Sequence, residues 1–360
     1  MCKRANHSHR VCAFYQLAVF GCLLFFTSIH LHTSAQTGAA KRDSTAGIMF
    51  YNVENLFDVV DDPKTNDDEF TPDGNRRWTY NRMRQKFSNL NRVILNAGGW
   101  NLPVVIGLCE VENSWVLSAW LRETGLYNLG YRYVHFDSPD SRGIDVAMLY
   151  RRERFKVYAS RPVEVNFGPG ERPTRDILYV KGVLDDADTL HVLVNHWPSR
   201  LGGAAASQPK RRHAATVVKN LADSIRNVNP DALLIVMGDF NEPPRSPIFL
   251  NDLKAGKLED DVWLISPALY LPPGKGTLKH GHAWEVFDQI LISRPFFEKK
   301  SPVQMNKPSM RIVEIPFLFQ PDDVHGGTKL FRSYEGFKYT GGYSDHLPVW
   351  IDLIVCEVEE

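Results

Sequence analysis

The chain has 360 residues, with 42 lysines and arginines against 42 aspartates and glutamates, so its formal net charge at pH 7 is zero. This balance excludes a strongly cationic nucleic-acid-binding protein. The sequence contains no internal repeat and no linker rich in proline and serine, so we expect one large domain after an N-terminal leader.

The N-terminus has the layout of a secretory signal peptide. Basic residues precede an apolar run, and small residues follow it: Lys3, Arg4 and Arg10, then residues 11–29, then residues 33–35. We predict a signal peptide over residues 1–35, a flexible segment over 36–46 and a folded domain over 47–360. A retained membrane anchor is the alternative, which the modest length of the run argues against. Processing would leave a secreted or periplasmic protein without a membrane span.

Signal cleavage would change the charge and the cysteine content. It removes three basic residues and no acidic ones, which leaves 39 against 42 and a net charge of −3. Of the five cysteines only Cys109 and Cys356 would remain. Both lie in apolar, strand-like runs, which favours buried thiols, although a disulfide between them stays open.

The first predicted strand covers residues 47–52 and ends at Asn52 and Glu54, an amide and a carboxylate two residues apart. An acidic, turn-rich loop follows over residues 58–73 and fits a solvated surface better than a calcium site. Thr79 is then a predicted N-cap. The helix that it begins has one apolar face for the core, formed by Met83, Phe87, Leu90 and Ile94.

A second buried strand, over residues 103–109, leads into Glu110. Glutamate is a poor strand former and is costly at the end of an apolar run unless it meets a cation. This favours a metal ligand over a simple strand terminator. A helix over residues 114–120 and strands over 131–136 and 146–150 follow. Between these strands, Arg142 is a candidate phosphate contact, whereas Asp145 suits a structural role equally well.

A hairpin is predicted from strands over residues 177–184 and 189–195. Its second strand ends at Asn195 and His196, and the proline corner that follows would hold the histidine in place. The next loop carries Arg200 and a basic run over residues 210–212. That run fits the first turns of a helix over residues 209–227 and substrate contact equally well.

The central strand is a continuous apolar run over residues 233–237, which is typical of a strand buried on both faces. It ends at Asp239 and Asn241, whose side chains point the same way on an extended backbone. Asp239 can then hold a water or a metal while Asn241 donates to an anionic oxygen. A plain turn after a core strand is the alternative.

Asp288 lies inside a predicted strand over residues 286–292, where a lone buried carboxylate needs a partner. His346, just before the last strand, offers one, so we predict an Asp-His dyad. Asp345 would then lie beside the metal.

Taken together, these motifs resemble the endonuclease/exonuclease/phosphatase family, which includes DNase I, apurinic endonucleases, sphingomyelinases and inositol-polyphosphate phosphatases. They occur in the family's order, from about residue 48 to residue 354: residues 51–55, 107–110, 195–198, 238–241 and 344–348. The resemblance implies an α+β fold, a four-layer αββα sandwich of two mixed β-sheets flanked by helices. The site would lie where the strand ends meet.

The resemblance also implies a metal site. Glu110 would be the principal Mg²⁺ ligand, assisted by Glu54 and Asp345, with Mn²⁺ or Ca²⁺ as alternatives. Glu54 departs from the family pattern, because some branches carry aspartate and others glutamine there, and this leaves its direct coordination in doubt. Carboxylate oxygens are what such a hard cation requires.

Further roles follow from the same resemblance. Asp239 would orient the attacking water, and His346, supported by Asp288, would act as base or stabilise charge on phosphorus. His196 would protonate the leaving oxygen. Asn52 and Asn241 would hold the phosphate. Apart from the resemblance, Asn195, Arg142 and Arg200 are candidate substrate contacts from their positions.

We therefore expect an exported, Mg²⁺-dependent phosphohydrolase that cleaves phosphodiesters by in-line attack of water, and nucleic acid is the simplest substrate. A phospholipid head-group phosphodiesterase or a phosphomonoesterase is the alternative within the enzymes. A non-catalytic binding module of the same fold is the alternative outside them. We expect a monomer, and the sequence leaves the substrate open.

Overall fold

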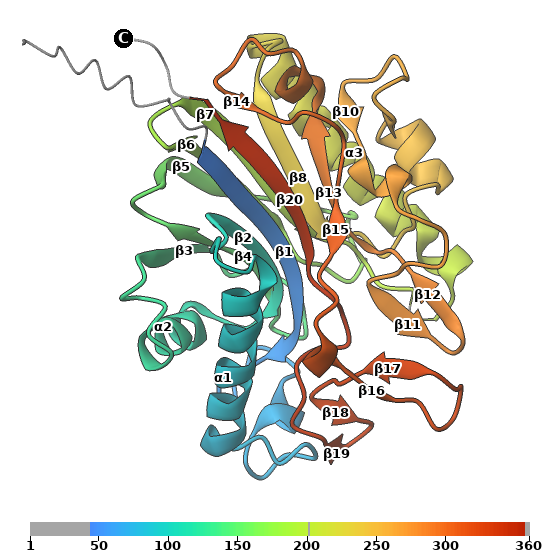
Figure 1. The fold of residues 1–360 in the computed structure, drawn as a ribbon. Helices are drawn as coiled ribbons and strands as arrows, with labels where there is room; N and C mark the ends of the chain where they lie inside the picture. Colours follow the sequence, from blue (N-terminus) through green and yellow to red (C-terminus); the bar gives the residue numbers. More distant parts are fainter. Residues whose placement is uncertain (1–43, 201, 357–360) are drawn as a thin grey trace, which may run out of the picture. The chain divides into compact units, whose positions relative to one another are not determined.

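The computed structural model describes residues 44–200 and 202–356. Two mixed sheets of seven strands each pack face to face, with the long helices on their outer faces (Figure 1). This is the predicted α+β sandwich. The predicted signal peptide over residues 1–35 lies outside the described residues, and so does most of the segment over 36–46.

The first sheet has the strand order β14-β20-β1-β2-β4-β3, with β15 also paired to β20. Its strands are β1 (Ser44–Leu56), β2 (Val105–Val111), β3 (Tyr131–His135), β4 (Asp145–Arg151), β14 (Val303–Gln304), β15 (Arg311–Ile312) and β20 (Val349–Val355). The β1 and β2 strands are parallel, whereas β20 runs antiparallel to β1. The first strand starts three residues earlier than predicted, because Ser44 to Ala46 pair with the end of β20.

The second sheet has the order β5-β6-β7-β8-β13-β10-β9. Its strands are β5 (Phe155–Val163), β6 (Ile177–Leu184), β7 (Asp188–His196), β8 (Leu233–Asp239), β9 (Ala255–Gly256), β10 (Leu264–Ile265) and β13 (Asp288–Ser293). The β7 and β8 strands are parallel, and β13 runs antiparallel to β8. All seven residues of β8 are buried, as its unbroken apolar run predicts.

Three α-helices cover the sheets within the described residues: α1 (Tyr80–Ala97), α2 (Ser114–Glu123) and α3 (Ala204–Val228). The α1 and α2 helices contact the first sheet, and the apolar stripe of α3 packs on the outer face of the second. Thr79 caps α1 as predicted. The predicted start of α3 at Pro209 is wrong, because three alanines extend the helix back to Ala204 and Pro209 lies inside it.

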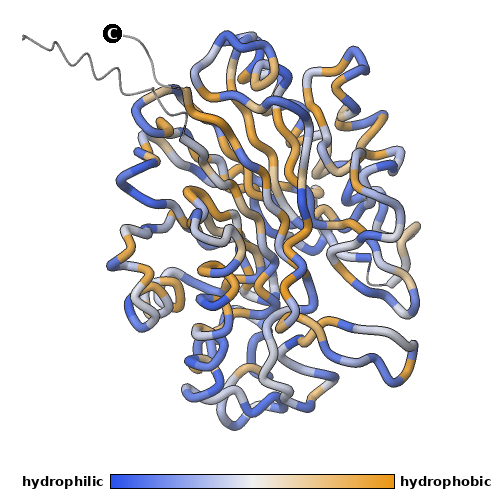
Figure 2. Tube along the Cα trace, in the orientation of Figure 1, coloured by the Kyte–Doolittle hydropathy of each residue, from blue (hydrophilic) through white to orange (hydrophobic). Residues whose placement is uncertain are grey.

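Shorter elements decorate the ends of the strands. The two-stranded pairs are β11 (Leu278–His280) with β12 (Ala283–Glu285), β16 (Phe319–Pro321) with β17 (Thr328–Leu330), and β18 (Tyr334–Glu335) with β19 (Lys338–Tyr339). The short helical turns are η1 (Asp68–Phe70), η2 (Ile248–Asp252), η3 (Pro267–Tyr270), η4 (Arg294–Phe297) and η5 (Pro316–Leu318). Figure 2 shows apolar residues concentrated along the central strands and polar ones in these outer hairpins and loops.

The topology brings chemically active residues to one edge of the sandwich. The carboxyl ends of the parallel pairs β1/β2 and β7/β8 lie there, together with the start of β13, whose Asp288 pairs with Asp239. The start of β20, which follows His346, is paired with β1 near the same edge. Among the described residues, no helix is long and apolar enough to cross a membrane.

Candidate active site

The first two strands leave regular geometry at this edge. Their register is interrupted after Asn52, and Glu54, Asn55 and Glu110 adopt left-handed backbone angles, with φ of 51°, 53° and 62°. Such a conformation costs about 1–3 kcal/mol for each residue that carries a side chain. Two hydrogen bonds compensate: Glu54 N–H donates to Asn52 Oδ1 at 3.0 Å, and Asn55 N–H donates to Glu110 Oε2 at 3.0 Å. The strain therefore accompanies the exact residues that the motifs singled out.

Glu110 presents a carboxylate of fixed orientation at the end of β2. Its side chain is 14% exposed, and Arg142 Nη2 lies 3.8 Å from its Oε2 atom. The same guanidinium donates to Asn55 Oδ1 at 2.6 Å. A partly exposed carboxylate that the backbone holds in place suits a hard divalent cation. The structure thus brings Glu110 and Arg142 together, while their metal and phosphate roles stay predictions.

Glu54 is surrounded by cationic and backbone donors. Its carboxylate is buried, Arg332 Nε donates to Oε1 at 2.9 Å, and Ser333 N–H donates to Oε2 at 2.7 Å. Lys86 Nζ lies 3.8 Å from the same Oε2 atom. Burial, followed by repulsion from Asp345, raises the pKa of Glu54. Both oxygens therefore belong to an ion-pair network, and the metal role of Glu54 stays a prediction.

Arg332 joins that network to Asp345. Its Nη2 atom lies 2.8 Å from Glu54 Oε1 and 2.8 Å from Asp345 Oδ2, and its side chain is 41% exposed. Burial raises the pKa of Asp345, but the charges of Arg332 and His346 outweigh it and hold this pKa below its usual value. One cation therefore bridges two of the three predicted metal ligands.

Sequence reasoning missed both cations of this network. Lys86 lies within the apolar stripe of α1, three residues after Met83, and a charged residue on a core-facing stripe was a signal that could have been used. Burial lowers its pKa to about 8, against the pull of Glu54. Arg332 follows β17, in a hairpin segment without periodicity, and carried no such signal.

Three side chains of the site surround one carboxylate oxygen of Asp239. Its Oδ2 atom accepts a hydrogen bond from Asn52 Nδ2 at 3.1 Å. The Nε2 atoms of His196 and His346 each lie 3.8 Å from that same oxygen. Burial raises the pKa of Asp239 to about 6, although His346 opposes the shift. A carboxylate with this pKa can take a proton from water near neutral pH.

His346 and Asp288 are in contact, as the dyad requires. His346 Nδ1 lies 2.7 Å from Asp288 Oδ2, and both side chains are buried. This contact turns Nε2 of the imidazole toward Asp239. Burial lowers the pKa of His346, but the carboxylates of Asp288 and Asp239 outweigh it and raise this pKa well above its ordinary value. The imidazole is therefore positively charged at neutral pH.

His196 has the opposite character. It is 5% exposed, and its Nδ1 atom has no hydrogen-bond partner among the described residues. Burial, with the nearby charges of Arg175 and Arg142, holds its pKa well below the ordinary value. A neutral imidazole can donate a hydrogen bond, but it carries no extra proton for a leaving group. This favours contact with a phosphate oxygen over the expected general-acid role.

Asn195 and Asn241 both donate from their side-chain amides to the backbone, since Asn241 Nδ2 donates to Trp197 O at 3.2 Å. Asn195 is fully buried, donates to Met237 O at 3.2 Å and accepts from Trp197 Nε1 at 3.2 Å. The amide of Asn195 therefore fixes the strand end, and its expected substrate contact stays a prediction. Asn241 adopts a left-handed φ of 51°, and its N–H donates to Asp239 Oδ1 at 3.0 Å. It orients the carboxylate of Asp239.

Arg200 and the basic run after it are held by local partners. Arg200 Nε donates to Asn241 O at 2.9 Å, and its guanidinium lies 4.5 Å from the ring centre of Phe287. The basic run is fully paired: Lys210 with Glu171 at 2.9 Å, Arg211 with Glu242 at 2.6 Å, and Arg212 with Asp252 at 2.8 Å. This supports the helix-packing interpretation of the run. Substrate contact by Arg200 stays a prediction.

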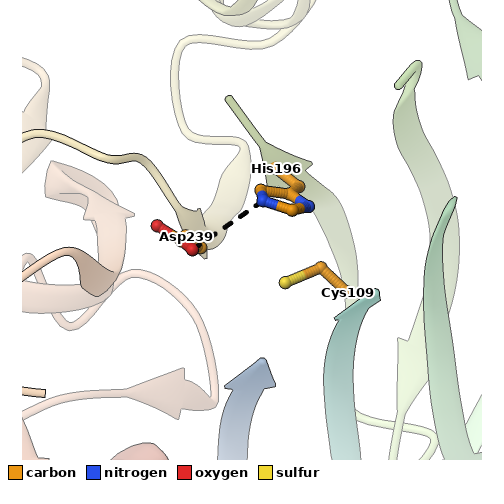
Figure 3. A group of neighbouring side chains, drawn as sticks. All are labelled: Cys109, His196 and Asp239. Carbon is orange, nitrogen blue, oxygen red and sulfur yellow. Dashed lines mark ion pairs between the residues drawn. The ribbon is translucent and has the colours of Figure 1, made fainter. Parts of the chain in front are cut away.

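Two groups of potential metal donors lie at the site, and both include Asp239. One joins it to Asp288 and His346; the other joins it to Cys109 and His196, drawn in Figure 3. In each group the donor atoms lie within 4.8 Å of one another. The expected trio of Glu110, Glu54 and Asp345 is not such a group among the described residues. Elsewhere, Asp145 pairs with His135 at 3.0 Å, which agrees with a structural role.

Comparison with known proteins identifies relatives of this arrangement. The sequence profile of the Endonuclease/Exonuclease/phosphatase family matches residues 47–354. A comparison with curated proteins found no match.

Solved structures share the fold at low sequence identity. A family protein of Bacteroides thetaiotaomicron superposes with a TM-score of 0.53 at 13% identity, covering 88% of this chain and 100% of its own. D. rerio TDP2, complexed with a single-strand DNA product, gives 0.52 at 15% identity, covering 86% and 99%. A mannosyl-6-phosphatase of Bacteroides thetaiotaomicron gives 0.52 at 13% identity, covering 86% and 99%. At such identities the likeness establishes the fold alone.

Proposed function

This chain belongs to the endonuclease/exonuclease/phosphatase family, and from that premise we propose that it hydrolyses phosphoric esters with the help of a divalent cation. The observation that carries the proposal is the buried oxygen of Asp239, held by Asn52 and faced by two imidazoles at 3.8 Å. Such an arrangement supplies a proton acceptor for water and positive or donor groups for a phosphate.

The residues fit a hard cation at one place. Glu110 offers a partly exposed carboxylate, and Asp345, whose Oδ2 atom is held by Arg332, is the second acidic group of this region. We propose that Glu110 holds Mg²⁺, with Mn²⁺ or Ca²⁺ as substitutes, and that Asp345 assists. When bound, such an ion neutralises charge on the phosphate oxygens and polarises phosphorus for attack.

The protein groups then divide the remaining work. Asp239 is ionised at pH 7 to 8 because its pKa is about 6, so it orients the attacking water and accepts its proton. His346, kept charged by Asp288, stabilises the negative charge that builds up on the phosphate oxygens. Neutral His196 and Arg142 donate hydrogen bonds to the same phosphate.

We propose a phosphodiester as the substrate, most simply a nucleic acid. A solved relative of this fold, TDP2, is complexed with a single-strand DNA product, which supports this class. A phospholipid head group is the alternative phosphodiester. The mannosyl-6-phosphatase of the same fold keeps a phosphomonoester as the second candidate. We further propose that the chain is exported by residues 1–35 and acts as a monomer outside the cytoplasm.

A substrate panel tests the proposed function. The panel contains plasmid DNA, RNA, sphingomyelin, inositol phosphates, bis-p-nitrophenyl phosphate and p-nitrophenyl phosphate, each with Mg²⁺ and with EDTA. We expect Mg²⁺-dependent cleavage of the diesters. His346→Ala should lower this cleavage by roughly two to four orders of magnitude. His280→Ala, at an exposed histidine, should leave it unchanged.

Two outcomes would contradict the proposal in different ways. Turnover of monoesters alone would make the protein a phosphomonoesterase. No turnover of any substrate, in a folded protein that binds Mg²⁺, would favour the binding module.

A further inference from the structure

We propose that Cys109, His196 and Asp239 form a site for zinc, and that zinc bound there inhibits the enzyme. His196 and Asp239 end the paired strands β7 and β8 of one sheet, and Cys109 lies two residues before the end of β2 in the other. Their donor atoms lie within 4.8 Å of one another, and all three side chains are at most 5% exposed. Figure 3 shows the thiol, the imidazole and the carboxylate directed toward a common point.

The spacing of the imidazole and the carboxylate suits an ion better than direct pairing. His196 Nε2 and Asp239 Oδ2 are 3.8 Å apart, which is too long for a hydrogen bond. Zinc ligands at about 2.0–2.3 Å in a tetrahedral arrangement lie roughly 3.3–3.8 Å from one another. An ion between the two groups would therefore need only small side-chain adjustments.

The imidazole of His196 lacks a hydrogen bond that a buried polar atom normally has. Its Nδ1 atom is buried without a partner among the described residues. Unsatisfied buried polar groups in a native protein call for an explanation, such as an ion or an ordered water.

The donor set selects zinc over magnesium. One sulfur, one nitrogen and one oxygen match the ligands of zinc, with a water completing the fourth position. Mg²⁺ requires oxygen ligands in near-octahedral geometry and does not use a thiolate. Glu110 directly follows Cys109, but among the described residues it is not part of this group of donors. Hence the two cations use different residues.

Inhibition follows from what zinc would occupy, and this part rests on the proposed function. Asp239 could no longer accept a proton from water, and His196 could no longer donate to phosphate. The binding itself does not depend on catalysis. Free zinc would thus switch off the enzyme while Mg²⁺ remains bound.

The experiment follows binding and activity separately in the full chain. Zinc is titrated into metal-free protein against a chromophoric chelator, and Co²⁺ is added as a spectroscopic substitute. We expect one Cys109-dependent zinc site and a near-ultraviolet charge-transfer band from a cobalt–thiolate bond. Cys109→Ser and Cys109→Ala should abolish the band and weaken zinc binding at least tenfold, with Mg²⁺-dependent activity retained. Cys356→Ser is the matched control and should keep the band.

The possible results separate the zinc site from the proposed function. No cobalt band in the wild type, or a band and zinc affinity unchanged in both folded Cys109 variants, would overturn the zinc site. Zinc binding that depends on Cys109 in a protein without phosphohydrolase activity would support the site and overturn the proposed function. Active protein whose zinc inhibition persists in both Cys109 variants would overturn the site alone. Circular dichroism and thermal melting check that each variant is folded.

Discussion

Two buried histidines face one carboxylate oxygen of Asp239, but one ring is charged and the other is neutral. His346 has Asp288 behind it, and the nearby carboxylates keep it protonated. His196 has no carboxylate on its far side, and burial keeps it neutral. The carboxylate behind His346 therefore suits this imidazole to stabilise negative charge. His196 lacks such a partner among the described residues and is suited only to donate a hydrogen bond.

We propose Asp239 as the proton acceptor, and ionising this buried carboxylate lowers the stability of the folded protein at neutral pH. Burial raises its pKa to about 6, against about 3.9 in an unfolded chain. A raised pKa means that the folded state is most favoured below about pH 4 and loses stability as the pH rises through 6. We expect Asp239→Asn to be inactive, equally stable at pH 4, and more stable than the wild type at pH 8 by up to about 3 kcal/mol.

Urea unfolding in EDTA at pH 4, 6 and 8 measures this difference. Asp261→Asn, at an exposed position, is the control and should follow the wild type at every pH. A stability gain that is the same at all three pH values would contradict titration of Asp239.

His196 provides a second prediction at this scale. Because its imidazole is neutral, we expect it to donate to a phosphate oxygen, which every substrate presents. His196→Ala should then slow cleavage of DNA and of bis-p-nitrophenyl phosphate by similar factors, roughly 10² to 10³. The sequence-based interpretation as a general acid requires a different result, because p-nitrophenolate needs no proton to leave. Loss confined to the alkyl ester would restore that interpretation.

At the scale of elements, the segment between β17 and β18 supplies the least expected part of the site. Arg332, in that segment, and Glu54, on β1, are separated by 278 positions in the chain. The guanidinium of Arg332 neutralises both Glu54 and Asp345. Those carboxylates can therefore lie close to each other without a metal between them. These ion pairs therefore hold the segment between β17 and β18 against the edge of the sandwich where the proposed active site lies.

We expect Arg332→Gln to lower stability in EDTA by about 1–3 kcal/mol, a range reduced because the side chain is 41% exposed. Added Mg²⁺ or Ca²⁺ should restore more stability to this variant than to the wild type, because the freed carboxylates can bind the ion. Thermal melting with and without the cation measures both effects. Lys338→Gln, on β19, is the control. Equal stabilisation of variant and wild type would show that Arg332 does not screen a cation site.

The elements themselves were largely predictable, and the exceptions have physical causes. Apolar runs predicted β2 and β8, because strands buried on both faces need no alternation. The Asp288–His346 contact was also expected, because a carboxylate inside an apolar strand requires a partner. Arg332 was not, since an ion pair across 278 residues leaves no local pattern. Asn195 was assigned to substrate because sequence cannot show which way a strand-end amide turns.

At the scale of the whole domain, the site depends on the distance between the two sheets. Asn52 belongs to the first sheet and Asp239 to the second, and one hydrogen bond of 3.1 Å joins them. The contact between Asp288 and His346 also joins the two sheets, because His346 precedes β20 of one sheet and Asp288 begins β13 of the other. Catalytic geometry is thus set by core packing beneath the site.

Gly107 tests this dependence. It lies on β2, where an added Cβ would be 2.7 Å from Met237 Sδ and 3.0 Å from Phe50 Cδ2. Gly107→Ala should therefore push the sheets apart or displace Met237, lowering stability by about 1–3 kcal/mol, and should reduce kcat more than it changes KM.

Replacing Met237 by valine removes the sulfur atom and costs about 1 kcal/mol alone through lost packing. If sheet spacing is the cause, Gly107→Ala with Met237→Val should regain stability and turnover, at least about 1 kcal/mol better than the sum of the single losses. Urea unfolding and steady-state kinetics on all four proteins measure the coupling, and strictly additive losses would mean that the two residues do not control the distance between the sheets.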